Sequence, residues 1–377
     1  MSNKINVAVI GCGERSRYVV GQLLKDSDRN VKIAAVYDPD KSQCEKCLKD
    51  WDVEGVLVAE SFEDSVVADG VTWTMVFSPN SLHREHILYA FNTGKHVFAE
   101  KPLAITIDDC REIYEAHQKS GLIFATGFVL RYAPVYRKAK EILDSGRIGK
   151  IISIDANENI TPGHGAYIMK NWRRNKELAG PHILEKCCHD LDLINWFCGS
   201  LPGRTASFGG LDFFIPENEH LRQKYGEEKF DILRDPHAVN SPFTSDKNLM
   251  DNQVSILEYR NNVRVQFQAT MSNPIPERRM YFSCTEGTLR LELYSGLLEY
   301  KSLGDNDTTK LELPGGGHGG GDSYIMKELY DTMTNGTPPA CGGNEGLESA
   351  VVALSLDKAA EIGRIIDLEP VWKSLGR

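Results

Sequence analysis

The chain has 377 residues, about twice the length of an ordinary domain, so two domains are expected. Its formal net charge is −10 and no run is rich in lysine and arginine, which argues against nucleic acid or an anionic membrane as a principal partner. No stretch approaches the roughly 20 apolar residues that span a bilayer, and the N-terminus shows no signal-peptide pattern, so we expect a cytoplasmic protein. The nine cysteines, an odd number, do not suggest a disulfide framework, and we expect reduced thiols, including Cys44 and Cys47.

The first third of the chain alternates short apolar runs with helical patterns. Strands are predicted at residues 5–10, 31–37, 71–77, 97–99 and 122–129. The intervening helices are predicted up to residue 25, through residues 44–48, and at 82–92 and 107–120. This alternation is typical of βαβ units, so residues 1–129 are predicted to form a doubly wound parallel sheet of the Rossmann type.

The pattern changes after residue 130, where strands become closely spaced. Helices are predicted at about 134–145, 183–197, 323–335 and 347–365, and strands at 150–155, 253–260, 263–271, 279–285, 288–294 and 297–302. Asn261 and Asn262 are predicted to form a tight turn, because asparagine tolerates positive φ. Residues 130–377 are therefore predicted to form an α+β domain with a mainly antiparallel sheet. The polar segment 212–251 is predicted to be a long loop that is functional or mobile.

A glycine-rich motif follows the first predicted strand and opens the first helix. In Gly11-x-Gly13-x-x-Ser16 the first glycine makes a tight turn, the second lets the backbone approach a pyrophosphate, and the third position is small. Serine at that third position departs from the usual glycine or alanine. We expect the pyrophosphate of a dinucleotide at the helix N-terminus, with contacts from Gly11, Cys12, Gly13, Glu14, Arg15 and Ser16.

Asp38 ends the second predicted strand. Its carboxylate is placed to accept hydrogen bonds from the adenosine ribose hydroxyls, and its charge would repel a 2′-phosphate, which favours NAD over NADP. The alternative is that Asp38 is only a turn residue before Pro39.

Polar residues also end the later strands of this sheet. Ser78 and Asn80 follow the third of the long strands, where open α/β sheets bind ligands, and they predict a cofactor contact or merely a turn and helix cap. Lys101 ends a buried strand, where desolvation lowers a lysine pKa and lets the amine bind or deprotonate an alcohol. The alternative is a surface lysine paired with Glu100. Pro102 stops the strand, and a cis peptide bond can occur at this position.

A second constellation lies on the helix predicted at 183–197. Glu185 and His189 are four residues apart and Asp192 is three further, so all three are predicted to share one face of this helix. Histidine is suited to acid–base work near neutral pH, and Glu185 would orient or stabilise its ring. The alternatives are a solvated polar face, or zinc bound by Cys187, Cys188, His189 and Asp192. Adjacent cysteines point about 100° apart on a helix, so no metal site is expected.

These motifs together resemble the Gfo/Idh/MocA oxidoreductase family, which includes glucose–fructose oxidoreductase and inositol dehydrogenases. The resemblance covers nearly the whole chain and is carried by residues 7–13, 78–83, 94–97, 100–102, 147–149 and 189–192. It implies that Lys101 and His189 flank the nicotinamide and the substrate, and it adds His83 and Glu100 to the expected cofactor side. The family usually has aspartate where Glu185 stands, and residues 186–188 also depart from its pattern. Residues 318–322 look like a motif of some sugar-directed members, with no assigned role.

The function implied is NAD-linked oxidation of a secondary alcohol on a sugar, sugar derivative or cyclitol. His189 would take the hydroxyl proton with support from Glu185, and Lys101 would hydrogen-bond the same oxygen. Further substrate contacts are expected from segments bordering the cleft, at Arg131, Asn157, His164 and Trp172. The alternatives are an enzyme that cleaves glycosides by transient oxidation with retained NAD, and a non-catalytic sensor of sugar and NAD. A homodimer or homotetramer joined through the second sheet is also expected.

Overall fold

The structure is a computed structural model that describes residues 5–230, 239 and 241–377. The chain divides into two compact units. The first comprises the chain up to Tyr132 together with Gly321–Leu347, and the second comprises Ala133–Gly320 and Glu348–Arg377. This division differs from the prediction of one boundary near residue 129 and an unbroken second domain from 130 to 377. The reason is that α12 (Gly321–Asn335) packs against α1 (Glu14–Asp26) of the first unit.

The first unit contains a six-stranded parallel sheet with the order β3-β2-β1-β4-β5-β6. Its strands are β1 (Ile5–Ile10), β2 (Val31–Tyr37), β3 (Leu57–Val58), β4 (Trp73–Val76), β5 (His96–Ala99) and β6 (Phe124–Thr126). The strand order reverses between β1 and β4, which is the switch point where such sheets bind ligands. β1 and β4 are almost wholly buried, as strands covered on both faces should be. The predicted doubly wound sheet is confirmed.

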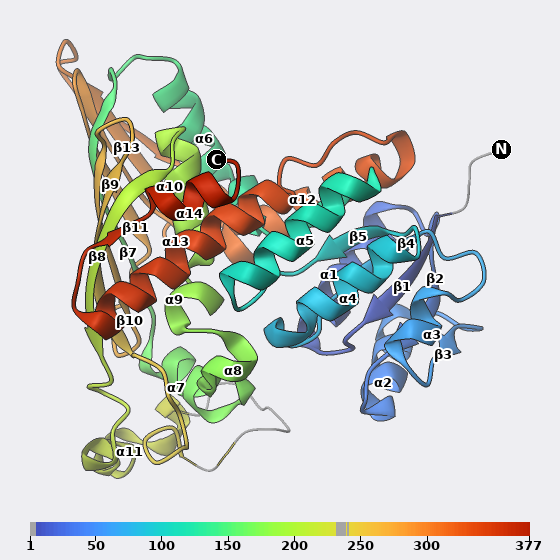
Figure 1. The fold of residues 1–377 in the computed structure, drawn as a ribbon. Coiled ribbons are helices and arrows are strands. Elements are labelled where there is room, and N and C mark those ends of the chain that lie inside the picture. Colours follow the sequence, from blue (N-terminus) through green and yellow to red (C-terminus); the bar gives the residue numbers. More distant parts are fainter. Residues whose placement is uncertain (1–4, 231–238, 240) are drawn as a thin grey trace. The chain divides into compact units, whose positions relative to one another are not determined.

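Helices connect the strands of this unit and surround them (Figure 1). They are α1, α2 (Lys41–Trp51), α3 (Phe62–Val66), α4 (His83–Asn92), α5 (Ile107–Ser120), and the 3-10 turns η1 (Asn80–Leu82) and η2 (Val129–Tyr132). Thr106 caps the N-terminus of α5, and its side chain accepts a hydrogen bond from the Asp109 N–H at 3.1 Å. The edge strand β6 is also covered, because the Thr126 N–H donates to the Cys341 carbonyl at 3.0 Å.

The second unit contains a nine-stranded sheet with the order β14-β13-β12-β11-β7-β10-β9-β8-β15. Its strands are β7 (Ile151–Asn159), β8 (Pro202–Gly210), β9 (Asn252–Tyr259), β10 (Arg264–Thr270), β11 (Arg279–Cys284), β12 (Gly287–Glu292), β13 (Leu297–Ser302), β14 (Thr309–Glu312) and β15 (Ile366–Asp367). Neighbouring strands are antiparallel except for β7 and β10, which are parallel, so the predicted mainly antiparallel sheet is confirmed. The predicted turn between β9 and β10 contains Asn262 at a φ of 66°.

Helices lie on one side of this sheet, where Figure 1 shows α6 (Pro134–Asp144), α10 (Cys188–Cys198), α13 (Gly343–Ile362) and α14 (Glu369–Ser374). Side chains of β9 alternate between buried and exposed. The face opposite the helices carries Phe208, Val254 and Ile256, whose exposed fractions are 76%, 40% and 58%. The shorter elements of this unit are α7 (Pro162–Lys170), α8 (Lys176–Ala179), α9 (His182–Glu185), α11 (His220–Tyr225), η3 (Trp172–Arg174), η4 (Pro216–Asn218), η5 (Glu227–Phe230) and η6 (Gly317–Gly320). Among the described residues of both units, none of the helices combines the length and the apolar character needed to cross a membrane.

The continuous helix predicted at 183–197 is wrong. α9 ends at Glu185 and α10 begins at Cys188, with Cys187 between them at φ −87° and ψ 0°. The break lies where Lys186 reaches the buried Glu158 at 3.8 Å, a contact with β7 that local sequence does not reveal. Glu185 and His189 are therefore not one turn apart on a regular helix.

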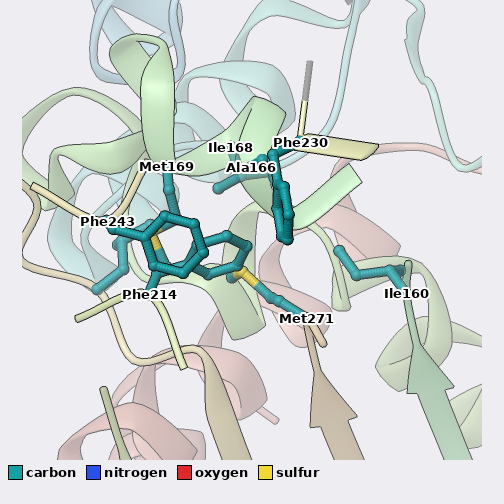
Figure 2. Close-up of a cluster of buried hydrophobic side chains, with 9 residues drawn as sticks. Ile160, Ala166, Ile168, Met169, Phe214, Phe230, Phe243 and Met271 are labelled. Atoms are coloured by element: carbon teal, nitrogen blue, oxygen red, sulfur yellow. The ribbon is translucent and has the colours of Figure 1, made fainter. Parts of the chain in front are cut away.

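The predicted long loop at 212–251 contains α11 and two 3-10 turns, and residues 231–238 and 240 of it lie outside the described residues. Apolar side chains from this segment pack against α7 and its neighbours (Figure 2). The cluster consists of Ile160, Ala166, Ile168, Met169, Phe214, Phe230, Phe243, Leu249 and Met271. It is a local core that anchors the described parts of the segment.

Phe243 tests whether this cluster stabilises the protein. Its ring is fully buried and lies 5.3 Å from the Phe214 ring and 5.4 Å from the Phe230 ring. We expect Phe243→Ala to lower the free energy of unfolding by about 3–5 kcal/mol through lost burial and a cavity, as measured by urea denaturation. Tyr225→Ala, at a side chain that is 51% exposed, is the control and should change stability by less than about 0.5 kcal/mol. Equal stability of the two variants would contradict the anchoring role.

Candidate active site

The loop between β1 and α1 has the geometry that a dinucleotide requires. Gly11 adopts a φ of 89°, and a Cβ there would lie 2.7 Å from the Phe77 carbonyl carbon, so only glycine fits. Gly13 precedes α1 without a side-chain cap, and a Cβ on Gly13 would meet nothing within 4 Å. The N-cap residue thus supplies no side-chain cap to the first N–H groups of α1, an arrangement that fits a pyrophosphate. Ser16 is buried, and its hydroxyl donates to the Gly13 carbonyl at 2.8 Å.

Asp38 follows β2 and is hydrogen-bonded to this loop. Its Oδ2 accepts from the Cys12 N–H at 2.8 Å, and its Oδ1 accepts from the Asp40 N–H at 2.9 Å. Asp38 thus forms the turn that the alternative interpretation expected. Each carboxylate oxygen retains a second lone pair, so this turn is compatible with ribose binding.

Two buried histidines fix the segments that follow β4 and β5. His83 places Nδ1 2.8 Å from the Pro102 carbonyl and Nε2 3.0 Å from the Ser78 carbonyl. The His86 Nδ1 lies 2.8 Å from the Ser78 hydroxyl. Burial lowers the pKa of His83, and the neutral ring donates to one of its two carbonyls at a time. His83, expected on the cofactor side, therefore joins the Ser78 segment to the lysine–proline segment. Asn80 is also buried in this region.

Arg15 connects three distant parts of the first unit. Its Nε donates to Glu100 at 2.7 Å and its Nη1 donates to Asp322 at 2.7 Å. Burial opposes the guanidinium charge, but the two carboxylates outweigh it and raise the pKa of Arg15. Arg15 and Glu100, both expected to face the cofactor, thus form an ion pair with each other, while the neighbouring Glu14 is exposed.

Lys101 follows the end of β5 and is half-buried. Its backbone N–H lies 3.3 Å from the Glu100 carboxylate, and the Lys101–Pro102 peptide bond is cis, at the position where the sequence admits one. The first unit therefore gathers the glycine loop, Asp38, Ser78, His83, Glu100 and Lys101 around the carboxyl ends of its strands.

In the second unit, His189 lies in the first turn of α10 and is 3% exposed. Its ring centroid is 6.1 Å from that of His318, and the two planes are tilted by 52°. His318 belongs to the glycine-rich segment whose motif had no assigned role.

Glu185 forms an ion pair with Arg173 of η3, whose Nε donates at 3.0 Å. The same guanidinium donates to the Tyr167 hydroxyl at 2.9 Å and lies 4.4 Å from the Trp172 ring centroid. The structure thus places Glu185 within a cation–aromatic group. The sequence around Arg173 does not predict its ion pair with Glu185, because the two residues belong to different elements, η3 and α9, and no local pattern relates them.

A fully buried charge network lies beside His189. The Arg278 guanidinium donates to both Asp190 oxygens at 2.8 and 2.6 Å and lies 3.0 Å from Glu158. Burial raises the pKa of Asp190 to about 7, whereas the charges of Arg278 and Lys186 outweigh burial and lower the pKa of Glu158 to about 2. Glu158, Cys187 and Asp190 also have ligand atoms close enough to hold a metal ion. Arg278 already supplies these carboxylates with a positive charge.

The four expected substrate contacts fall into different environments. Asn157 joins β7 to β11, since it accepts from the Arg279 N–H at 3.0 Å and donates to Glu277. His164 is in α7, and burial lowers its pKa to about 3. Trp172 lies under Arg173. Arg131 belongs to the first unit, 3.9 Å from Glu345.

Comparison with known families gives matches to both parts of the chain. A family model described as "Oxidoreductase family, NAD-binding Rossmann fold" matches residues 5–128. A second, described as "Oxidoreductase family, C-terminal alpha/beta domain", matches residues 140–368. Together they cover most of the chain.

Several curated proteins are similar over long regions. YteT of Bacillus subtilis (strain 168), described as an oxidoreductase, is 23% identical over 377 residues, covering 85% of this chain and 88% of that protein. The 2,7-anhydro-N-acetylneuraminate hydratase of Mediterraneibacter gnavus is 29% identical over 255 residues, covering 68% and 61%. The scyllo-inositol 2-dehydrogenase (NAD(+)) of Bacillus subtilis (strain 168) is 26% identical over 227 residues, covering 60% and 62%. The chain thus spans about three fifths of the last two relatives.

A solved structure of levoglucosan dehydrogenase in complex with NADH and levoglucosan has a similar fold. The TM-score is 0.80, and the match covers 97% of this chain and 99% of that one. At 15% identity this likeness shows the shared fold alone.

The buried histidines predict how stability depends on pH. Burial lowers the pKa of His86 to about 4 and that of His164 to about 3, against about 6.5 in an unfolded chain. Both rings are neutral when folded, so the unfolded chain binds more protons below pH about 6.5. Stability that is present above that pH should be lost as the pH falls toward 4, with a slope of up to about 1.4 kcal/mol per pH unit for each ring.

Urea denaturation between pH 4 and 8 measures this slope. His86→Asn should reduce it by about one proton, whereas His220→Asn, at an exposed position, should not. An identical slope in the wild type and His86→Asn would show that the buried ring does not carry the effect.

Proposed function

Because the chain belongs to the Gfo/Idh/MocA oxidoreductase family, we propose that it catalyses NAD-dependent hydride transfer to or from a secondary alcohol of a sugar, sugar derivative or cyclitol. The observation that carries this proposal is the uncapped start of α1 beside Gly13, on the same sheet edge as Lys101. A dinucleotide site and a strand-terminal lysine at one edge of a parallel sheet support hydride chemistry there.

The residues present suit NAD. The α1 N-terminus and the loop from Gly11 to Ser16 would hold the pyrophosphate, and Asp38 would accept from the adenosine ribose hydroxyls. We propose NAD rather than NADP, because the Asp38 carboxylate would repel a 2′-phosphate. When bound, the nicotinamide exchanges a hydride at its C4 with the carbinol carbon.

We propose that His189 takes the hydroxyl proton during oxidation while Lys101 hydrogen-bonds the same oxygen and stabilises its developing negative charge. Arg15 neutralises Glu100 at 2.7 Å, so this carboxylate does not depend on Lys101 for a counterion. This contact favours the functional interpretation of Lys101 over a simple pair with Glu100. The roles of Lys101 and His189 could also be exchanged, with the same products.

Glu185 is proposed to support the His189 imidazolium through its negative charge. Its ion pair with Arg173 holds the carboxylate in place, and the positive charge of Arg173 also partly offsets the negative charge of Glu185. Asn157, His164, Trp172 and Arg131 remain proposed substrate contacts, of which His164 is the one held neutral by burial.

The experiment that tests the function is a screen for NADH formation against sugars, glycosides and cyclitols. Stoichiometric NADH with one of these alcohols would support the proposal. Absence of both NADH and any other product across the panel, with NAD and sugar still bound, would favour the non-catalytic sensor instead.

A second candidate is redox-neutral chemistry in which bound NAD is regenerated within each cycle. The similarity to a 2,7-anhydro-N-acetylneuraminate hydratase supports this second candidate, since hydration causes no net oxidation or reduction of its substrate. Glycoside cleavage by transient oxidation is the corresponding possibility for a glycoside substrate. Product formation with only catalytic NAD, without accumulating NADH, would identify this second function.

We also propose that two or four copies of the chain associate through the open face of the nine-stranded sheet. Phe208 and Ile256 are large apolar side chains that are 76% and 58% exposed on this face, and burying such a surface favours association. Sedimentation velocity should show an oligomer for the wild type and a lower mass for Ile256→Asp. A monomeric wild type would contradict the assembly.

The central mutational prediction concerns Lys101 and His189. Lys101→Ala and His189→Ala should each lower kcat by at least about 10²-fold, because a positioned proton donor or acceptor contributes roughly 10²–10⁴-fold. NAD binding, measured by calorimetry, should persist in both variants. Lys119→Ala and His220→Ala, at exposed side chains, are the matched controls. Normal turnover in both Lys101→Ala and His189→Ala would refute the assignment.

A further inference from the structure

We propose that His318 relays the proton between His189 and solvent. This inference rests on the proposed function, in which His189 takes the hydroxyl proton. It assigns a task to the glycine-rich motif at residues 318–322, which the mechanism above does not use.

Burial of His189 creates the need for a relay. His189 is only 3% exposed, so a proton that its ring accepts must pass through other groups before the next turnover. Asp190 and Asp192 on the same helix are 0% and 2% exposed, and Glu185 is 7% exposed. Asp190 and Glu185 are also hydrogen-bonded to Arg278 and Arg173. These carboxylates are poor exits to solvent.

His318 meets the geometric requirement. Its ring centroid lies 6.1 Å from that of His189, a separation that one bridging water molecule can span. Unlike the carboxylates, His318 is half-buried and therefore has access to solvent. An imidazole accepts and releases protons near neutral pH, which a relay requires.

The backbone around His318 is built to hold this position. His318 adopts the left-handed conformation, with φ 47° and ψ 41°, which costs energy for a residue that has a Cβ. Its neighbour Gly319 packs so closely that a Cβ would lie 2.4 Å from the Leu293 side chain and 3.2 Å from Ala133. Strain maintained by tight packing beside a candidate acid–base group indicates a functional constraint.

The proton balance of the step is simple. Oxidation of one alcohol breaks its C–H bond toward the cofactor and its O–H bond toward His189, and a carbonyl group forms. The proton then passes from the His189 imidazolium to the His318 imidazole, and from there to water or buffer. The reverse reaction runs these transfers in the opposite order and consumes one proton.

His318→Asn provides the test, because asparagine tolerates the left-handed conformation and lacks an imidazole. Rapid mixing of holoenzyme with an active alcohol in weak buffer would follow NADH by absorbance and released protons with an indicator dye. We expect an NADH burst in the first turnover, proton release at least 10-fold slower than in the wild type, and recovery on adding free imidazole. His220→Asn, at an exposed histidine, should match the wild type.

The possible outcomes distinguish a failure of the His318 relay from a failure of the proposed hydride-transfer function. Wild-type proton release in His318→Asn, or a slow release that imidazole does not restore, would overturn the relay and leave the proposed function standing. A wild type that forms no NADH with any alcohol of the panel would overturn the proposed function and the relay with it. Thermal melting of His318→Asn would show whether the fold is intact.

Discussion

The first unit depends on the position of one guanidinium group. Arg15 extends from the first turn of α1 and bonds to Glu100 at the end of β5 and to Asp322 at the start of α12, each at 2.7 Å. Replacing Arg15 would leave the two largely buried carboxylates, Glu100 and Asp322, without this counterion, and such a loss costs about 3–5 kcal/mol. The ion pairs therefore fix the dinucleotide loop, the lysine-bearing strand end and a helix some 300 residues away in one arrangement. His83 reinforces this arrangement by joining the Ser78 and Pro102 carbonyls.

The second unit uses the same kind of constraint. Arg278 is almost wholly buried and compensates Asp190 and Glu158, which ties the first turn of α10 to β7. His189 is next to Asp190, so its backbone is fixed by this network. The two candidate acid–base groups, Lys101 and His189, thus each adjoin a carboxylate held by arginine. Fixed charges of this kind are what preorganised sites use in place of mobile water.

The sequence alone predicts most of the strands and the motifs at their ends. Local sequence patterns are sufficient to predict β1, β2 and β5, the glycine loop, and the position of Lys101 at the end of a strand. Buried parallel strands appear as short apolar runs, and tight turns are marked by glycine and other turn residues. A residue's partner across the fold leaves no such signal. The break at Lys186 and Cys187, the Glu185–Arg173 pair, and the packing of Phe243 all depend on residues distant in sequence. For the same reason the sequence of α12 predicts only an amphipathic helix, and it does not predict that the helix packs in the first unit.

The return of the chain to the first unit between Gly321 and Leu347 has a consequence for how this protein can be divided. A fragment ending at Tyr132 would contain every strand of the parallel sheet. It would lack Asp322, the segment that covers the edge of β6, and the helix that covers part of α1. Cutting the chain at a single position therefore does not separate the complete nucleotide-binding unit from the rest of the protein. Gene fusion or recombination would have to transfer two separate stretches of sequence together, which links the inheritance of cofactor binding to that of the region that follows residue 320.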